Sequence, residues 1–464
     1  NPSKKTPNKI FFIGIGGSGM SGLAEVLFNL GYDVSGSDLI DSAVTKRLKS
    51  LGIGVRIGHE ANNVNSQEMI IKSTAIDEEN VELIKARKLG LPILKRAELL
   101  SSLMNMKRSV AIAGTHGKTT TTSILASIMT EAMLDPTFIN GGIINSFASN
   151  AKLGTGDYLL AEADESDKSF LMLQPSLEII TNIDSDHLVN YENDMNNLER
   201  AFIEFVKKLP FNGLLVACGD DPIIKKLMPS FSRKTILYGF NDQNDYVVGN
   251  YSASSFSSEF TLTNDEGVTS NFSLNLPGKH NVLNAAAASV LAIEEGISLI
   301  NVQSALAKFS GISRRMQFLG KLDQTAVIDD YGHHPTEIKN TILTLRESFP
   351  ESEISMVFQP HRFTRTKDLY EGFVEVLKSV DRLILLEIYS AGEEPIDGIS
   401  STSLLESIKN TGLEKALLAK SNTEAYELIE NMISKEKGVL LMQGAGNISE
   451  ISAKLTKKLK NNDF

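Results

Sequence analysis

A glycine-rich loop between an apolar run and a helix constrains this chain more than any other feature. The apolar run is Ser109–Ala113, and a helix is expected from Lys118 to about Glu131. A strand that enters a tight glycine turn and leaves it as a helix is typical of a parallel α/β unit. The loop and its first helical residues are Ala113, Gly114, Thr115, His116, Gly117, Lys118, Thr119 and Thr120.

The composition of this loop is typical of a phosphate-binding turn. Its glycines let successive backbone N–H groups face phosphate oxygens, and the helix N-terminus adds partial positive charge. Lys118 can neutralise the β- and γ-phosphates of ATP, and the Thr119 hydroxyl can ligate Mg²⁺. The usual pattern has a glycine where this chain has Ile112. We therefore predict an ATP site built on a variant loop with a shorter glycine spacing.

The rest of the chain alternates short apolar runs with helix-like stretches, which predicts parallel sheets covered by helices. At 464 residues it is long enough for about three domains. We predict a Rossmann-like N-terminal domain over residues 1–107, a central ATP-binding domain over 108–318 and a Rossmann-like C-terminal domain over 319–464. Residues 245–276 are Ser/Thr-rich and alternate partly with period two. They predict a small antiparallel sheet attached to the central parallel one.

Composition and charge exclude several other classes of protein. The formal net charge of −11 argues against a general affinity for nucleic acid. No stretch approaches the apolar length of a membrane span, and the single cysteine, Cys218, excludes an intrachain disulfide framework. We expect a cytoplasmic protein that contacts neither nucleic acid nor membrane and is a monomer or a weak homodimer.

A second glycine cluster lies near the beginning of the chain. Gly14-Ile15-Gly16-Gly17-Ser18-Gly19 follows a predicted strand and opens a predicted helix, and Asp38 ends the next strand. This arrangement matches a dinucleotide-binding fingerprint, with Asp38 placed to bond a ribose. The motif indicates a bound pyrophosphate more firmly than it indicates NAD, so an NAD-dependent dehydrogenase stays open at this point.

Acidic residues follow two predicted strands of the central domain. Glu162, Asp164, Glu165 and Asp167 come after one strand, and the segment Thr181–Leu188, which contains His187, comes after another. Carboxylates at strand ends beside a phosphate loop are where Mg²⁺ ligands are expected. His187 could instead cap the following helix.

The remaining polar groups lie in the C-terminal part of the chain. Arg314-Arg315 follows a loop glycine and can clamp a phosphoryl group. Asp329–Pro335 and Gln359–Arg365 each follow a predicted strand, and the paired His333 and His334 have no cysteine or HExxH partner. Substrate recognition is therefore favoured over a zinc site.

Together these motifs resemble one family, the Mur ligases of peptidoglycan precursor synthesis, over essentially the whole chain. Within the family the chain looks most like the members that join L-alanine to UDP-N-acetylmuramate. The segments that carry the resemblance are Gly14–Gly22, Gly114–Thr120, Glu162–Asp167, Thr181–His187, His280–Ala285, Asp330–Pro335, Gln359–Arg365 and Ala391–Glu393.

The resemblance implies a UDP-sugar domain, a central ATPase and an amino-acid domain, in that order. It implies that the lactyl carboxylate attacks the γ-phosphate of ATP, and that the L-alanine amine then attacks the acyl phosphate. The UDP-sugar residues that it implies are Gly14, Gly16, Gly17, Ser18, Gly19, Asp38 and Ser73. Asn281 and Asn284 would face the adenine, and Asp330 the ribose. The implied catalytic residues are Lys118, Glu162, His187, Arg315, His333 and Arg365, and the implied Mg²⁺ ligands are Thr119, Glu162 and His187.

Two departures and three rival functions accompany the resemblance. Several sister ligases carry a carbamylated lysine where this chain has Phe202, and the alanine-adding members also lack that lysine. Asn447 stands where an acidic residue is expected. The rivals are a recycling ligase that adds a whole peptide, an NAD-dependent dehydrogenase and a nucleotide-binding regulator without turnover. The Gln359–Arg365 segment argues against the first, and the clustered metal ligands argue against the last.

Overall fold

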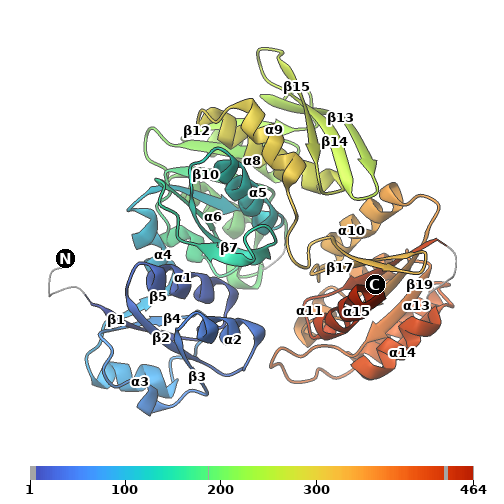
Figure 1. The fold of residues 1–464 in the computed structure, drawn as a ribbon, viewed down its shortest axis with the longest axis horizontal. Helices are drawn as coiled ribbons and strands as arrows, with labels where there is room; N and C mark the ends of the chain where they lie inside the picture. The colour runs from blue at the N-terminus through green and yellow to red at the C-terminus, as the bar shows by residue number, and fades with distance from the viewer. Residues whose placement is uncertain (1–6, 186–187, 433–436, 463–464) are drawn as a thin grey trace. The chain divides into compact units, whose positions relative to one another are not determined.

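The computed structural model describes residues 7–185, 188–432 and 437–462 and contains three sheets, each flanked by helices (Figure 1). The expected α/β fold with three domains is confirmed. The chain forms two compact units, and the first unit includes the first sheet and most of the second. The first unit comprises Asn1–Asn250, Thr261–Phe272 and Leu283–Phe309, and the second comprises Tyr251–Phe260, Ser273–Val282 and Ser310–Phe464.

The first sheet has the strand order β3-β2-β1-β4-β5 and is parallel throughout. Its strands are β1 (Lys9–Ile13), β2 (Asp33–Asp38), β3 (Gly54–Ile57), β4 (Met69–Lys72) and β5 (Ile93–Lys95). Its helices are α1 (Ser18–Asn29), α2 (Ala43–Ser50), α3 (Val81–Lys88) and α4 (Arg96–Met104), with the 3₁₀ helix η1 (Ala61–Asn63). Because helices cover both faces, β1 is an uninterrupted apolar run rather than an alternating one. The sequence patterns did not predict β3, β5 or α4.

The second sheet has the order β15-β14-β13-β12-β11-β10-β6-β9-β7-β8. Its strands are β6 (Arg108–Ala113), β7 (Thr137–Ile144), β8 (Ser149–Lys152), β9 (Tyr158–Glu162), β10 (Leu177–Ile180), β11 (Leu214–Cys218), β12 (Lys234–Gly239), β13 (Tyr246–Ser254), β14 (Ser257–Thr263) and β15 (Thr269–Leu274). Neighbouring strands are parallel along the sheet from β13 through β12, β11, β10, β6 and β9 to β7. The edge strand β8 is antiparallel to β7. The chain reverses in the short turns 255–256 and 264–268, so β13, β14 and β15 form the expected antiparallel extension (Figure 1).

The helices of the central region cover this second sheet. They are α5 (Lys118–Glu131), α6 (Met195–Val206), α7 (Pro222–Leu227), α8 (Lys279–Glu294) and α9 (Leu299–Lys308), with the 3₁₀ helices η2 (Ser169–Met172), η3 (Leu188–Tyr191) and η4 (Met228–Ser230). Helix α5 begins and ends at the predicted residues, and the alanine-rich segment 281–295, whose composition predicts a helix, forms most of α8.

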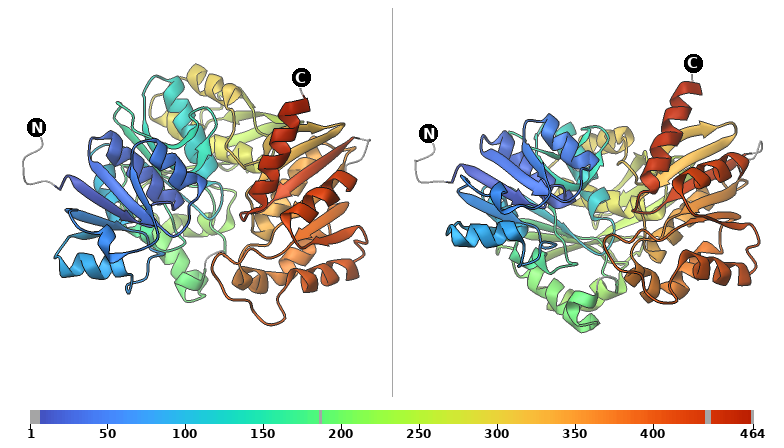
Figure 2. Two further views of the ribbon diagram at one scale, coloured as in Figure 1. Left: turned by 60° about the horizontal axis from the view of Figure 1, so that its bottom comes forward. Right: turned by 90° about the horizontal axis from the view of Figure 1, so that it is seen from below.

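The third sheet has the order β16-β17-β21-β18-β19-β20, in which only the β16–β17 pair is antiparallel. Its strands are β16 (Gln317–Leu322), β17 (Thr325–Asp330), β18 (Glu353–Phe358), β19 (Arg382–Leu386), β20 (Ala416–Ala419) and β21 (Gly438–Gln443). Its helices are α10 (Pro335–Ser348), α11 (Phe363–Asp368), α12 (Tyr370–Leu377), α13 (Ser401–Asn410), α14 (Asn422–Met432) and α15 (Ile448–Asn462). Helix α15, red in Figure 2, packs along β16 and β21.

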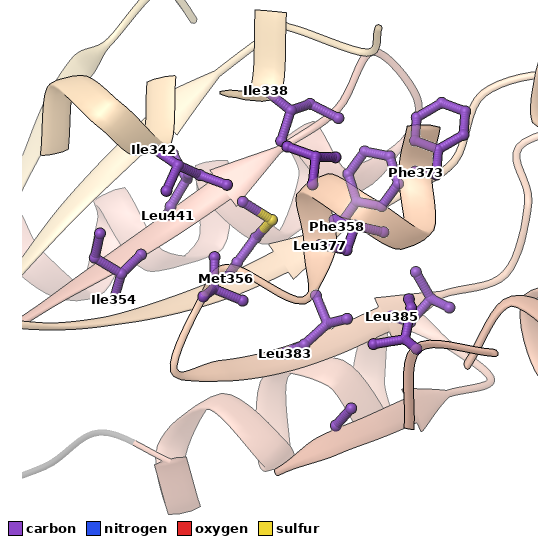
Figure 3. Close-up of a cluster of buried hydrophobic side chains, with 14 of the residues drawn as sticks. Ile338, Ile342, Ile354, Met356, Phe358, Phe373, Leu377, Leu383, Leu385 and Leu441 are labelled. Carbon is purple, nitrogen blue, oxygen red and sulfur yellow. The ribbon is translucent and has the colours of Figure 1, made fainter. Parts of the chain in front are cut away.

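One face of the third sheet carries the largest apolar cluster of the second unit. Met356 and Phe358 of β18 lie among Ile338 of α10, Phe373 of α12 and Leu383 of β19, all fully buried (Figure 3). Each such side chain stabilises the fold by about 1.5–3 kcal/mol when it leaves water. This core fixes the carboxyl ends of β17 and β18, where the polar segments 329–335 and 359–365 lie.

Helix α1 joins the first sheet to the second within the first unit. A Cβ on Gly22 would lie 3.2 Å from both Ala151 Cβ and Ile139 Cγ2, so only glycine lets α1 approach β7 and β8 this closely. Arg47 of α2 adds a hydrogen bond from Nη2 to Ser149 Oγ at 2.8 Å. In the part of the chain that the structure describes, no helix is long and apolar enough to cross a membrane.

Candidate active site

The predicted phosphate loop lies between β6 and α5. Gly114 has a φ of +130° and Gly117 a φ of +86°, conformations that glycine adopts without a steric penalty. A Cβ on Gly114 would lie 2.1 Å from Thr181 Oγ1, and a Cβ on Gly117 would lie 2.3 Å from Asn284 Oδ1. The loop therefore requires glycine at both positions for its backbone conformation and for space.

Residues that follow β10 hold the loop in its shape. The Asn182 carbonyl accepts from Thr115 N at 3.0 Å, and Asn182 Oδ1 accepts from His116 N at 2.8 Å. Thr181 Oγ1 donates to the His116 carbonyl at 2.6 Å. The sequence pattern predicts metal ligands in this segment, but it does not predict the hydrogen bonds by which Thr181 and Asn182 support the phosphate loop. The available signal was two polar residues directly after a buried strand.

Asp184 also belongs to this support. Its backbone N–H donates to Thr115 Oγ1 at 2.8 Å, and its Oδ2 lies 3.8 Å from His116 Nε2. The interaction with the nearby His116 ring lowers the pKa of Asp184 to about 2, so this carboxylate is ionised at neutral pH. The predicted ligand His187, like Asp186, lies outside the described residues.

Lys118 is held at the mouth of the loop by carbonyls and one carboxylate. Its Nζ donates to the Gly114 carbonyl at 2.6 Å and to Glu165 Oε2 at 2.7 Å. Burial lowers the pKa of Lys118, but the charges of Glu165 and Asp164 raise it by more, so the amine stays protonated. Burial raises the pKa of Glu165 to about 7, against the opposing effect of Lys118. A buried ammonium beside a glycine loop is well suited to meet an incoming phosphate.

The predicted metal ligands Thr119 and Glu162 converge on one point beside Gly141. Gly141 N donates to Glu162 Oε1 at 2.7 Å. A Cβ on Gly141 would lie 3.0 and 3.1 Å from the two Glu162 oxygens and 3.3 Å from Thr119 Oγ1. Carboxylate and hydroxyl oxygens are the donors that Mg²⁺ prefers. Among residues 7–185, 188–432 and 437–462, no group of three or more His, Cys, Asp or Glu side chains is arranged around a cation.

The two asparagines of α8 have different surroundings. Asn284 is buried, and its Oδ1 accepts from Thr121 Oγ1 at 3.3 Å, which places it against the phosphate loop. Asn281 is also buried, and its Nδ2 donates to the Pro277 carbonyl at 2.7 Å. Thr120 lies buried in the first turn of α5. Contacts of the asparagines with adenine remain a prediction.

The first glycine cluster forms the turn between β1 and α1. Gly14 has a φ of +79°, and a Cβ there would lie 3.4 Å from Ser73 Cβ, so the predicted Ser73 does adjoin the turn. Gly16 N donates to Asp38 Oδ2 at 2.8 Å, and a Cβ on Gly16 would lie 2.8 Å from that oxygen. Gly17 caps the helix with ordinary extended dihedrals. The predicted residues Gly14, Gly16, Gly17, Asp38 and Ser73 are thus brought together. Ser18 and Gly19 open α1.

A buried network that sequence analysis missed lies beneath this turn. The Ser37 carbonyl accepts from both Gly14 N and Ile15 N. The Ser37 hydroxyl donates to Glu82 Oε2 at 2.6 Å, and Asn63 Nδ2 donates to Glu82 Oε1 at 2.7 Å. His59 Nδ1 lies 2.9 Å from Glu82 Oε2. Since Glu82 is 0% exposed, these hydrogen bonds, together with one from Glu60 N at 3.4 Å, offset the cost of its burial.

The second unit gathers arginines and aromatic rings around the segment 329–335. The guanidinium carbons of Arg314 and Arg315 lie 5.3 and 5.4 Å from the Tyr331 ring centre. Arg315 Nη1 is 3.8 Å from Glu337 Oε1. Burial lowers the pKa of His333 to about 4, so its ring is neutral at neutral pH. His333 can therefore accept a proton or one hydrogen bond, but it does not attract an anion by charge.

The segment 359–365 lies beside this group. The ring centres of His333 and His361 are 5.8 Å apart, and His361 stacks on Tyr389 at 5.5 Å. Arg365 Nη1 is 3.1 Å from His361 Nδ1. Burial, helped by Arg365, lowers the pKa of His361 to about 4. Arg362 has a φ of +71°, a conformation that costs a non-glycine residue about 1–3 kcal/mol and that is often found at functional sites.

Two residues of the C-terminal site bind other protein groups. Asp330 is buried, and its carboxylate accepts from Met316 N at 2.9 Å, Gly332 N at 3.0 Å and Gln443 Nε2 at 2.8 Å. Its predicted contact with a ribose stays a prediction. Asn447 Oδ1 accepts from Gln359 Nε2 at 2.6 Å, a role for this unexpected asparagine in holding the segment 359–365.

Comparison with known proteins follows the same three regions. Residues 9–108 match the model described as Mur ligase family, catalytic domain, and residues 112–292 match the Mur ligase middle domain. Residues 314–446 match the Mur ligase, glutamate ligase domain. The chain belongs to the Mur ligase family, whose members are ATP-dependent ligases of peptidoglycan precursor synthesis.

Solved structures of this family superpose on the whole chain. The UDP-N-acetylmuramate–alanine ligase MurC from Thermotoga maritima is 30% identical, with a TM-score of 0.85 over 98% of this chain and 99% of that one. A murein peptide ligase from Psychrobacter arcticus is 23% identical, with a TM-score of 0.72 over 97% and 98%. The MurF ligase from Thermotoga maritima in complex with ADP is 17% identical, with a TM-score of 0.62 over 92% and 95%.

Proposed function

We propose that this protein joins L-alanine to the lactyl carboxylate of UDP-N-acetylmuramate at the expense of ATP. The observation that carries the proposal is the loop 114–120, with its buried ammonium and two converging oxygen ligands. The carboxylate would displace ADP from the γ-phosphorus to form an acyl phosphate. The amine of L-alanine would then attack the acyl carbon and release phosphate. Both substrates of the first step are anionic, so charge neutralisation and positioning supply most of the catalysis.

Lys118 would bind the β- and γ-phosphates of ATP. The amide groups of Gly114–Thr120 would bind phosphate oxygens, and the incoming phosphate would compete with Glu165 for the ammonium. Glu165, with its pKa near 7, can take up a proton when it loses that partner. Asn281, Asn284 and Asp330 would contact the nucleoside.

Thr119 and Glu162 would hold Mg²⁺, since their oxygens already converge beside Gly141. We assign His187 as a further ligand from the resemblance. The bound cation neutralises charge that develops on the transferring phosphoryl group. Gly141 N keeps the Glu162 carboxylate oriented, and the Thr119 hydroxyl is fixed at the first turn of α5.

The second unit would supply the amino-acid site. Arg365, Arg362 and Arg315 carry the charges suited to a carboxylate or an acyl phosphate. His333, neutral at physiological pH, would accept a hydrogen bond from the alanine ammonium and so help to orient it. Asn447 would keep the segment 359–365 in place through Gln359.

The remaining parts of the proposal follow the same assignment. The domain borders stay near residues 107 and 318, supported by family matches over residues 9–108, 112–292 and 314–446. Phe202, at the position of a carbamylated lysine in sister enzymes, is buried with its ring 5.3 Å from that of Phe170. That apolar setting suits a ligase that needs no carbamate. We also propose a cytoplasmic location and a monomer or weak homodimer.

The murein peptide ligases are the second candidate, because one of their structures superposes on the whole chain. Phosphate release separates the candidates when it is measured with ATP, Mg²⁺, UDP-N-acetylmuramate and either L-alanine or L-alanyl-γ-D-glutamyl-diaminopimelate. We expect release with L-alanine and little with the tripeptide. Release with the tripeptide alone would replace the proposal by the recycling activity, and release with neither would refute both.

A further inference from the structure

Arg96 lies beside the first glycine turn and forms no salt bridge with any residue that the structure describes. It is the first residue of α4, at the end of β5. A Cβ on Gly19 would lie 2.9 Å from Arg96 Nη1 and 3.3 Å from Arg96 Cζ, so the guanidinium rests directly on the backbone of the first turn of α1. The sequence motif ends at Gly19 and gave no reason to include this arginine.

The hydrogen-bonding capacity of Arg96 is largely unused. A guanidinium carries five N–H donors. Within the described part of the chain, its only hydrogen bond runs from Nη2 to Ser169 Oγ at 3.5 Å, the limit for such a bond. No carboxylate among the described residues lies within 4.0 Å of it. The Arg96 side chain is half-buried, so solvent satisfies these donors only in part.

Two helix dipoles act against the positive charge of Arg96, whereas the carboxylate of Asp164 attracts it. The positive end of the α4 dipole lies at Arg96 itself, and the positive end of α1 lies at Gly19 beside it. A cation is destabilised at either position. Two helix N-termini, a glycine turn and an arginine with no salt bridge among the described residues together suit an anion that carries more than one charge.

We propose that Arg96 donates hydrogen bonds to the diphosphate of the nucleotide sugar bound at the Gly14–Gly19 turn. The inference rests on the proposed function only for the identity of the nucleotide. Arg96 also lies near the acidic segment of the ATP site: burial raises the pKa of Asp164, while the positive charges of Lys118 and Arg96 are among the interactions that lower it below its ordinary range. A diphosphate on Arg96 would therefore lie on the side of the turn that faces the ATP-binding segment.

Calorimetric titration of the full chain with UDP tests the proposal on Arg96→Ala, Arg96→Lys and Lys95→Ala. Lys95 is exposed and is the N-cap of α4, next to Arg96. Lys95→Ala therefore removes one positive charge at the same end of the same helix, as Arg96→Ala does. We expect UDP affinity to fall about tenfold or more in Arg96→Ala, because charge-assisted hydrogen bonds are lost. Arg96→Lys should recover part of it, and Lys95→Ala should stay within about twofold of wild type.

Ser169→Ala and ATP binding separate a ligand contact from a structural bridge. Ser169→Ala removes the hydrogen-bond acceptor that Arg96 has among the described residues and should leave UDP affinity unchanged. ATP affinity should be the same in all variants. Unchanged UDP affinity in Arg96→Ala, an equal loss in Ser169→Ala or a parallel loss of ATP affinity would each overturn the inference.

The outcome is independent of the reaction assigned above. If wild type binds UDP through Arg96 but releases no phosphate with L-alanine, the proposed reaction fails and the inference stands. If wild type turns over and Arg96→Ala binds UDP equally well, the inference fails and the reaction stands.

Discussion

The two glycine turns of the first unit begin alike and are completed differently. Both connect a buried parallel strand to a helix. At the first turn, the Asp38 carboxylate accepts a hydrogen bond from Gly16 N. The cation beside this turn is Arg96, which belongs to α4 and is far from the turn in sequence. At the second turn a lysine within the motif itself, Lys118, is held by a buried carboxylate, that of Glu165.

This difference separates binding from catalysis. A carboxylate on a loop amide suits a ligand with a hydroxyl, such as a ribose, and leaves the turn to position a substrate that does not react there. A buried ammonium poised between a carboxylate and an incoming phosphate suits charge that moves during the reaction. Under the proposed function, the same local geometry supports two roles, which the charged side chains at each turn distinguish.

Lys118→Ala should have the largest effect, because it removes the group that distinguishes the second turn. We expect the rate of phosphate release to fall by about 10²–10³, since one stabilising charge is lost at the transferring phosphoryl group. The matched control is Lys207→Ala, at the exposed C-terminal cap of α6, which should retain full activity. A folded Lys118→Ala protein with near-normal turnover would remove the catalytic distinction between the turns.

Glu82→Ala should destabilise the first turn from beneath. The change leaves the buried donors of Ser37 and Asn63 without their acceptor. The free energy of unfolding, measured in urea, should fall by about 2–3 kcal/mol. Glu79→Ala, at an exposed position nearby, should change it by less than about 0.5 kcal/mol. Equal stabilities of the two variants would show that the network does not support the turn.

Gly117→Ala and Gly17→Ala compare matching positions, the residues that cap α5 and α1. Gly117 has a φ of +86° and no room for a Cβ, whereas Gly17 has a φ of −61° and its nearest neighbour would be 3.5 Å away. Gly117→Ala should lose about 1–2 kcal/mol of stability and most ATP affinity. Gly17→Ala should lose no more than about 1 kcal/mol. Thermal unfolding and ATP titration of both variants measure the contrast, which equal losses would contradict.

Glu178→Gln, unlike the other substitutions, should stabilise the protein. Glu178 in β10 is fully buried, as Glu82 is. Unlike Glu82, it has no hydrogen-bond partner on either carboxylate oxygen among the described residues. Burial raises the pKa of Glu178 well above its ordinary range. Because the folded state binds the proton more tightly, wild-type stability should fall as pH rises above about 4.5, the ordinary value for the unfolded chain.

The Glu178→Gln variant lacks this dependence on pH. Its advantage in unfolding free energy should be near zero at pH 4 and about 1–2 kcal/mol at pH 8. Glu259→Gln, on the exposed face of β14, should show no such trend. An advantage that does not grow with pH would mean that Glu178 is not protonated in the folded protein.

Local patterns predicted the elements that have a strong period or a defined turn. Helix α5 matched its prediction at both ends because a glycine turn starts it and its apolar residues recur at helical spacing. Strands β3, β5 and β20 were missed because they are short and lie toward the sheet edges, where partial exposure weakens the apolar signal. The edge strand β8 and its neighbour β7 were missed as well.

The sequence by itself determined the order of the domains, the two glycine turns and the polar residues that follow the predicted strands. These depend on neighbours in the chain, whose backbone preferences act locally. Only the tertiary structure decided that Glu165 meets Lys118, that Gly141 orients Glu162, that Asn447 holds Gln359, and that Arg96 rests on Gly19. Each of these contacts joins residues far apart in sequence, and strand order and helix packing alone bring them within hydrogen-bonding distance.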